Sequence, residues 1–173
     1  GTFGRWTDRF PNKLPGIANH NAMQIEPLRD TIVVSVHARD ELHALDPDDP
    51  AREIVRLRSA GPKPVLRPFA ALEHAPNIAR LVYFSPLDDG IVYTIAPPRE
   101  RDSGSGSSGT WSWEAHAPPE GTLQPIADAA GRSRFVGNLA HVFGRFRIAS
   151  IAGIDVAILV RHVDSPVYAC RLN

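Results

Sequence analysis

A histidine and two arginines in the last third of the chain share the spacing of one strand face. His141, Arg145 and Arg147 are separated by even numbers of residues, so in an extended backbone their side chains point to the same side. A histidine can remove a proton beside the carboxylate of an acidic sugar, and arginines can neutralise the charge of that carboxylate. We therefore expect these three residues to be the catalytic set if the chain is a lyase. An ion-paired strand face without activity produces the same pattern, and this alternative stays open.

A second group of residues is suited to holding a ligand. His20 precedes an apolar segment as His141 does, and Trp111 and Trp113 alternate along another segment. Indole rings stack on sugars and contact protein partners, and an imidazole can donate or accept a hydrogen bond. We expect His20, Trp111 and Trp113 to bind a ligand, although a buried histidine that bonds only to neighbouring backbone is the alternative for His20.

The sequence lacks common catalytic, metal-binding and phosphate-binding motifs. It contains no H-E-x-x-H, no G-x-S-x-G and no glycine-rich phosphate loop. The single cysteine, Cys170, rules out a cysteine-rich zinc site and an internal disulfide. We expect no metal and no cofactor.

The elements that must position these residues are short strands. Three hairpins are predicted, because apolar and β-branched runs flank polar turns. Their paired segments are 31–36 with 42–45, 80–84 with 90–95, and 156–160 with 166–170. Each turn holds an aspartate, and three or four residues later a ring lies in the second strand. The aspartates are Asp40, Asp89 and Asp164, and the rings are His43, Tyr93 and Tyr168.

Each hairpin is preceded by another predicted strand and a break in the chain. These first strands are expected at 20–25, 68–72 and 141–146, and the breaks at Pro27, Pro76 and Ala152-Gly153. Outer fourth strands are predicted at 53–57 and 110–114, and 3–7 resembles an outer strand without its own unit. Helices are expected only near 51–57, which is as easily a strand, and near 126–130.

A unit of four strands that recurs every 40–50 residues or so is typical of a β-propeller blade. With a tryptophan on the outer strand before the next unit, as at Trp6, Trp111 and Trp113, the chain resembles kelch-type and galactose-oxidase-like propellers. The resemblance implies an all-β fold of about three four-stranded blades in an incomplete ring. The blades span 20–58, 68–118 with a flexible insertion at 99–110, and 136–173 without an outer strand, after a stray strand and loop at 1–19.

The resemblance also implies what such a chain could do. Copper-radical oxidation is rejected, because the only cysteine, Cys170, lies in the last predicted strand rather than in an early blade. A non-catalytic module that binds a carbohydrate or a protein is expected, with a polysaccharide lyase as the alternative. Because three blades do not close a ring, a second copy, a partner chain or another part of a longer precursor is expected to complete it. The resemblance implies a secreted or periplasmic location.

Charge and composition exclude two classes of function, nucleic-acid binding and a membrane-spanning helix. The 173 residues contain 19 basic and 19 acidic side chains, so the chain lacks the basic excess of a nucleic-acid-binding domain. No run of 18 apolar residues occurs in the sequence, and none is long enough for a membrane-spanning helix. With 43% hydrophobic residues, a chain of this length can bury the core of one domain.

Overall fold

A computed structural model describes residues 21–49, 53–85, 90–98, 109–118, 145–160 and 167–172. These residues form β-strands in three sheets, and their only helix is a single 3₁₀ turn, η1 (His37–Arg39). The expected all-β class is therefore confirmed. Among the same residues, no helix is long and apolar enough to cross a membrane.

Sheet 1 is an antiparallel meander in which each strand pairs with the next one along the chain. Its central strand is the β-branched run Thr-Ile-Val-Val-Ser-Val, a composition that favours a pleated, buried strand. Its strands are β1 (Ala22–Glu26), β2 (Thr31–Val36), β3 (Glu41–Leu45) and β4 (Val55–Arg56).

Sheet 2 repeats this meander and adds one strand at its outer edge. In the order β5-β9-β8-β7-β6, all neighbours are antiparallel except β5, which runs parallel to β9. Its strands are β5 (Arg58–Ala60), β6 (Ala71–Ala75), β7 (Arg80–Phe84), β8 (Val92–Ala96) and β9 (Thr110–His116). The segment that leaves sheet 1 thus extends sheet 2.

Sheet 3 has three antiparallel strands among the described residues. They are β10 (Phe146–Ile151), β11 (Ile154–Val160) and β12 (Val167–Arg171). The first hairpin closes over Ala152 and Gly153, both with positive φ (50° and 77°), which is the backbone that tight hairpin turns require.

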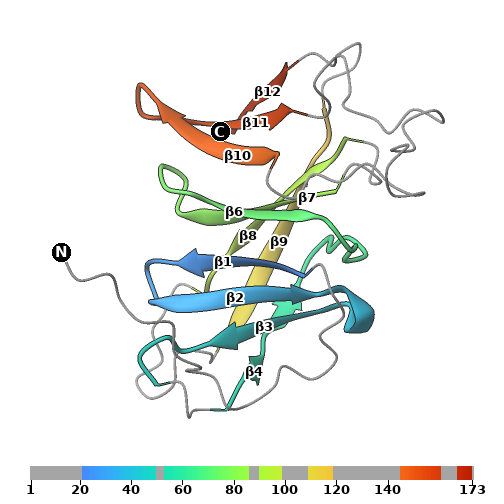
Figure 1. The fold of residues 1–173 in the computed structure, drawn as a ribbon, viewed down its shortest axis with the longest axis vertical. Helices are drawn as coiled ribbons and strands as arrows, with labels where there is room; N and C mark the ends of the chain where they lie inside the picture. The colour runs from blue at the N-terminus through green and yellow to red at the C-terminus, as the bar shows by residue number, and fades with distance from the viewer. Residues whose placement is uncertain are drawn as a thin grey trace, which may run out of the picture.

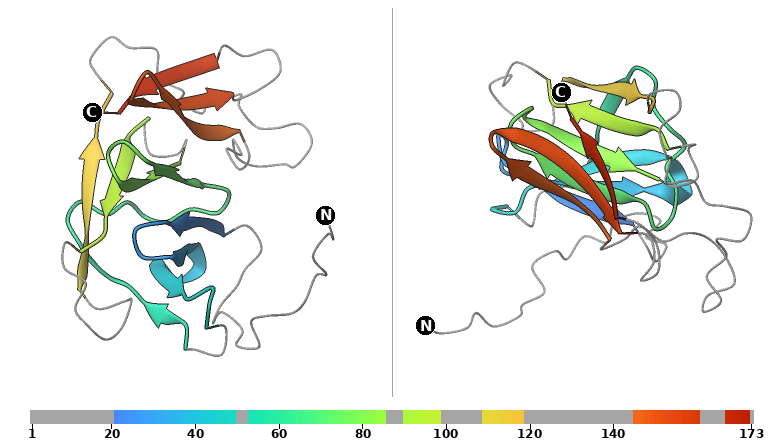
Figure 2. Two further views of the ribbon diagram at one scale, coloured as in Figure 1. Left: turned by 90° about the vertical axis from the view of Figure 1, so that its left-hand side faces the viewer. Right: turned by 90° about the horizontal axis from the view of Figure 1, so that it is seen from above.

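The three sheets are stacked side by side, with sheet 2 in the middle (Figure 1; Figure 2 shows the same stack from two other sides). The first strand of each meander lies next to that of the neighbouring meander, β1 beside β6 and β6 beside β10. One apolar cluster joins sheets 1 and 2 and contains both Trp111 and Trp113. A second joins sheets 2 and 3, where the rings of Phe84 and Phe146 stack with centroids 5.2 Å apart.

The pairing of strands places three sets of residues at equivalent positions in the three sheets. Across the first three strands of each meander, one row of paired residues contains the ring that the sequence predicted at His43, Tyr93 and Tyr168. These rows are Met23-Val34-His43, Leu72-Tyr83-Tyr93 and Phe146-Leu159-Tyr168. The repeat seen in the sequence is therefore a repeat of strand register.

Two aspartates fasten neighbouring parts of the stack. The Oδ2 atom of Asp155, a fully buried residue of β11, accepts hydrogen bonds from the backbone N–H groups of Asn77 (2.7 Å) and Ile78 (3.1 Å) in sheet 2. Its Oδ1 accepts a third bond, from Asn77 Nδ2 at 2.7 Å. Asp40 ties the β2–β3 turn to the segment before β6 through the Leu66 N–H (2.7 Å) and the Lys63 ammonium (2.6 Å).

Several predicted boundaries are wrong. The strand expected at 68–72 is β6, which starts at Ala71, because the chain turns at Pro68 and Phe69 (φ 60°). Of the strand expected at 141–146, residues 141–144 lie outside the described residues and Arg145 lies in a turn, while β10 starts at Phe146 and runs to the Ala152-Gly153 turn. The outer strand expected at 53–57 is confirmed in a shorter form, because residues 55–56 form β4 and pair with β3; residues 51–52 lie outside the described residues.

Other expected features lie outside the described residues. These are the strand at 3–7 with Trp6, the helix at 126–130, most of the insertion at 99–110, and the turn aspartates Asp89 and Asp164.

Candidate functional site

The predicted site residues have different outcomes. His20 and His141 lie outside the described residues. Arg145 immediately precedes β10, and Arg147 is the second residue of that strand, with both side chains exposed. Of the expected catalytic set, the structure therefore describes the two arginines, and Arg147 contacts sheet 2 through Glu73.

The expectation that Trp111 and Trp113 bind a ligand is wrong, because ligand stacking requires exposed indole rings. Both side chains are fully buried between sheets 1 and 2. Trp113 makes edge-to-face contacts with Tyr83 and Tyr93, at centroid distances of 6.0 and 6.3 Å. The alternate residues of β9, including Glu114, are exposed instead. These tryptophans belong to the core and offer no stacking surface to a sugar.

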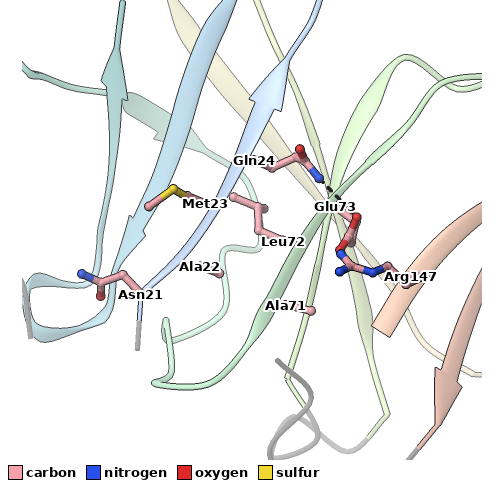
Figure 3. A pocket seen from close by; sticks show the side chains of 8 residues that line it. All are labelled: Asn21, Ala22, Met23, Gln24, Ala71, Leu72, Glu73 and Arg147. Atoms are coloured by element: carbon pink, nitrogen blue, oxygen red, sulfur yellow. Dashed lines mark hydrogen bonds and ion pairs between the residues drawn. The ribbon is translucent and has the colours of Figure 1, made fainter. Parts of the chain in front are cut away.

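The structure does bring together three polar residues from three different sheets. They are Gln24 on β1, Glu73 on β6 and Arg147 on β10. Each is the next residue after the one that begins the row of paired residues described above (Met23, Leu72 or Phe146), so the three occupy equivalent positions in the first strands of the meanders. We call them the inner row. Figure 3 shows the amide of Gln24 and the guanidinium of Arg147 both pointing at the carboxylate of Glu73.

Hydrogen bonds connect the inner row from sheet 1 to sheet 3. Gln24 Nε2 donates to Glu73 Oε2 at 3.2 Å, and Arg147 donates to Glu73 Oε1 in an ion pair. The carboxylate side chain is only 15% exposed, whereas that of Arg147 is 66% exposed. Glu73 is thus fixed from both sides, while the guanidinium remains open to solvent and to a ligand.

A cavity of about 280 Å³ lies beside the inner row. Its lining comes from β1, β6 and β10, which are the first strands of the three meanders, and from the residue before β1. The lining residues are Asn21, Ala22, Met23, Gln24, Ala71, Leu72, Glu73 and Arg147 (Figure 3). At one end, Asn21 Oδ1 lies 2.9 Å from the His37 ring nitrogen Nδ1.

The chemistry of this lining is that of a hydrogen-bonding site. An amide, a carboxylate and a guanidinium together offer both donors and acceptors. The described lining contains no histidine, tyrosine or cysteine, and no cluster of three or more metal-binding side chains occurs among the described residues. The part of the site that the structure describes can bind polar groups, with Arg147 as its cation.

Gln24 and Glu73 were missed by the sequence analysis, although a signal for them exists. Each lies three residues before a proline that ends its strand, Pro27 or Pro76, so aligning the prolines aligns the two residues. Arg147 cannot be found this way, because the turn after β10 contains two residues where the other two turns contain four.

Comparison of the chain with protein-family models, with curated proteins and with solved structures finds no match.

Proposed function

We propose that this chain is a non-catalytic binding module of β-propeller type, in which the cavity beside the inner row binds a carbohydrate. The stack of sheets supports the propeller assignment, because blades are antiparallel meanders whose first strands line a central channel. Gln24, Glu73 and Arg147 occupy the position of channel-facing residues in this arrangement.

The inner row is the observation that carries the proposal. Sugar hydroxyls both donate and accept hydrogen bonds, and the row presents an amide, a carboxylate and a guanidinium over a short distance. The cavity, about 280 Å³, lies near the lower end of the range of roughly 300–1,000 Å³ for small-molecule sites. This volume suits a single sugar unit better than a long polymer.

The alternative proposal is a lyase that uses the same arginine. Its observation is that Arg147, one of the residues expected to neutralise a uronate carboxylate, lines the cavity. The pairing of Arg147 with Glu73 favours binding over lysis, because the guanidinium charge is already partly compensated by a neighbouring carboxylate.

Titration calorimetry with neutral and uronate monosaccharides and disaccharides tests the proposal. We expect Glu73→Gln to weaken binding at least tenfold, because a hydrogen bond to a charged group contributes about 1.5–3 kcal/mol and about 1.4 kcal/mol is tenfold in affinity. Glu114→Gln is the matched control, since Glu114 on β9 also pairs with an arginine, Arg80, but does not line the cavity.

The results separate the proposals clearly. If no sugar of the panel binds, or if Glu73→Gln and Glu114→Gln bind equally well, the carbohydrate site is not the inner row. If a uronate oligosaccharide gains the absorbance of unsaturated ends, and this turnover is lost in Arg147→Gln, the lyase alternative replaces the binding module.

A further inference from the structure

The hydrogen bonds of Gln24 determine which of its groups remain for a ligand in the cavity. The backbone N–H of Ile25 donates to Gln24 Oε1 at 2.9 Å. Because a backbone N–H is always a donor, the atom that it contacts is the oxygen, and the Gln24 atom that contacts Glu73 is Nε2. Gln24 therefore adds a donor to the lining, the remaining hydrogen of its amide nitrogen.

The amide of Asn21, at the other end of the lining, is oriented in the same way. Its Oδ1 accepts the backbone N–H of His37 at 3.4 Å and lies 2.9 Å from His37 Nδ1, which must then carry the ring hydrogen. These two donors occupy both lone pairs of Oδ1. The oxygen of Asn21 is therefore no acceptor for a ligand, and its nitrogen, Nδ2, is a donor without a partner among the described residues.

Both carboxylate oxygens of Glu73 are already engaged, whereas most of the Arg147 guanidinium is not. Oε2 of Glu73 accepts from Gln24 and Oε1 accepts from Arg147, and the Glu73 side chain is only 15% exposed. Arg147 uses Nη1 for this pair, and the part of the chain that the structure describes contains no other partner for its guanidinium. Since the Arg147 side chain is 66% exposed, its remaining N–H groups are open to a ligand. The described lining thus has an excess of donors.

A lining with an excess of donors selects a ligand that brings acceptors. Every hydroxyl of a neutral sugar that accepts a hydrogen bond also carries a hydrogen that needs an acceptor of its own. A carboxylate brings acceptors alone, and it matches the planar fork of a guanidinium, with hydrogen bonds roughly twice as strong as those between neutral groups.

We propose that the sugar bound beside the inner row is acidic, and that Arg147 binds its carboxylate. The inference rests on the proposed function and narrows it from carbohydrates in general to uronates, sugars that carry a carboxylate on the ring. The ligand would approach the exposed side of the guanidinium, while the carboxylate of Glu73 holds the other side. Arg147 would then bridge the two carboxylates, so that the negative charge of Glu73 orients the guanidinium without occupying the position of the ligand.

Titration calorimetry with matched pairs of methyl glycosides tests the inference. The pairs are a glucoside with its glucuronide and a galactoside with its galacturonide, which differ only in a carboxylate that replaces a hydroxymethyl group. We expect each uronide to bind about tenfold more tightly than its neutral partner, because a hydrogen bond to a charged group contributes more than one between neutral groups. In Arg147→Gln, the affinity for the uronides should fall to that for the neutral glycosides, since the amide keeps a donor but has no charge.

Arg145→Gln is the matched control, because Arg145 is also an exposed arginine at the start of sheet 3 but does not line the cavity. It should keep the preference for uronides, and circular dichroism should show unchanged β-structure in both variants. Equal binding of neutral and acidic glycosides by the unaltered protein overturns the inference and leaves the proposed function standing. A preference that persists in Arg147→Gln, or that Arg145→Gln removes equally, overturns it as well. If no glycoside of either kind binds, the proposed function fails and the inference fails with it.

Discussion

Removal of the Asp155 carboxylate is expected to destabilise the fold more than removal of any solvent-exposed aspartate. Asp155 is fully buried and accepts three hydrogen bonds from Asn77 and Ile78 across the junction between sheets 2 and 3. In Asp155→Ala, two backbone N–H groups lose their acceptor. An unsatisfied buried donor costs about 1–3 kcal/mol, and because Asn77 is exposed and Ile78 is half-buried, the cost of each lies at the lower end of this range. Part of this cost is offset because the carboxylate no longer has to be buried.

The net expected loss is about 2 kcal/mol in the free energy of unfolding. With an m-value of about 2 kcal/mol/M in urea, the midpoint should fall by roughly 1 M. Urea unfolding followed by tryptophan fluorescence measures this midpoint, because Trp111 and Trp113 are buried in the folded chain.

Asp46→Ala is the matched control for Asp155→Ala. Asp46 Oδ1 also accepts two backbone N–H groups, from Asp48 (3.0 Å) and Asp49 (3.2 Å), but within one solvent-accessible turn. Water can replace these bonds, so the expected cost is below about 1 kcal/mol. Equal midpoint shifts in the two variants would refute the reasoning that burial, and not the number of hydrogen bonds, sets the cost.

Two further predictions concern a glycine and a surface ion pair. Gly61→Ala should lower the urea midpoint, because Gly61 has φ +97° and an added Cβ would lie 2.4 Å from the carbonyl oxygen of Trp113; an unchanged midpoint would contradict this close approach. A hydrogen bond from Arg80 lowers the pKa of Glu114 below its ordinary value. The pair therefore stabilises the fold at pH values above the pKa that Glu114 has in the unfolded chain. This contribution is lost as the pH falls through the lower pKa that Glu114 has in the folded chain. A carbon-detected NMR titration should show the lowered pKa of Glu114 rising toward its ordinary value in Arg80→Gln, and an equal pKa in both proteins would contradict the assigned cause.

The hairpins could be predicted from the sequence because their signals are local. Residues 31–36 are β-branched for the most part, and Pro27 and Pro76 lie at the start of the turns that they predict. Each pairing joins segments a few residues apart, so the choice of partner is nearly fixed once the turn is placed. The equivalence of His43 and Tyr93 followed from these local patterns and is confirmed by the register.

Strand β5 could not be predicted in the same way. Its residues, Arg-Ser-Ala, have neither alternation nor β-branched side chains, and its partner, β9, begins 52 residues after β5 begins. Pairing at that distance depends on how sheets 1 and 2 pack, which no local pattern encodes. The strand forms because the outer edge of β9 has unpaired backbone groups, and the chain passes along this edge between β4 and β6.

The candidate site was predicted only in part. Arg147 was found because its spacing from other charged residues follows the strand period. The burial of Trp111 and Trp113 was misjudged, although their alternation with Ser112 and Glu114 already indicated one apolar face and one polar face. Glu73 was missed because its role depends on contacts from two other sheets, which appear only once the sheets are stacked.

The parallel pairing of β5 with β9 has a consequence for the order in which the chain folds. Strands β1 to β3 can pair as soon as residue 45 has left the ribosome, because their partners are adjacent in the chain. β5 must wait until residue 112 is available to pair with Ala60. The contact that holds the segment between sheets 1 and 2 to β9 is therefore among the last contacts of sheets 1 and 2 to form. After β9 has paired with β8 and until β5 pairs with it, the outer edge of β9 is open to the strands of other nascent chains.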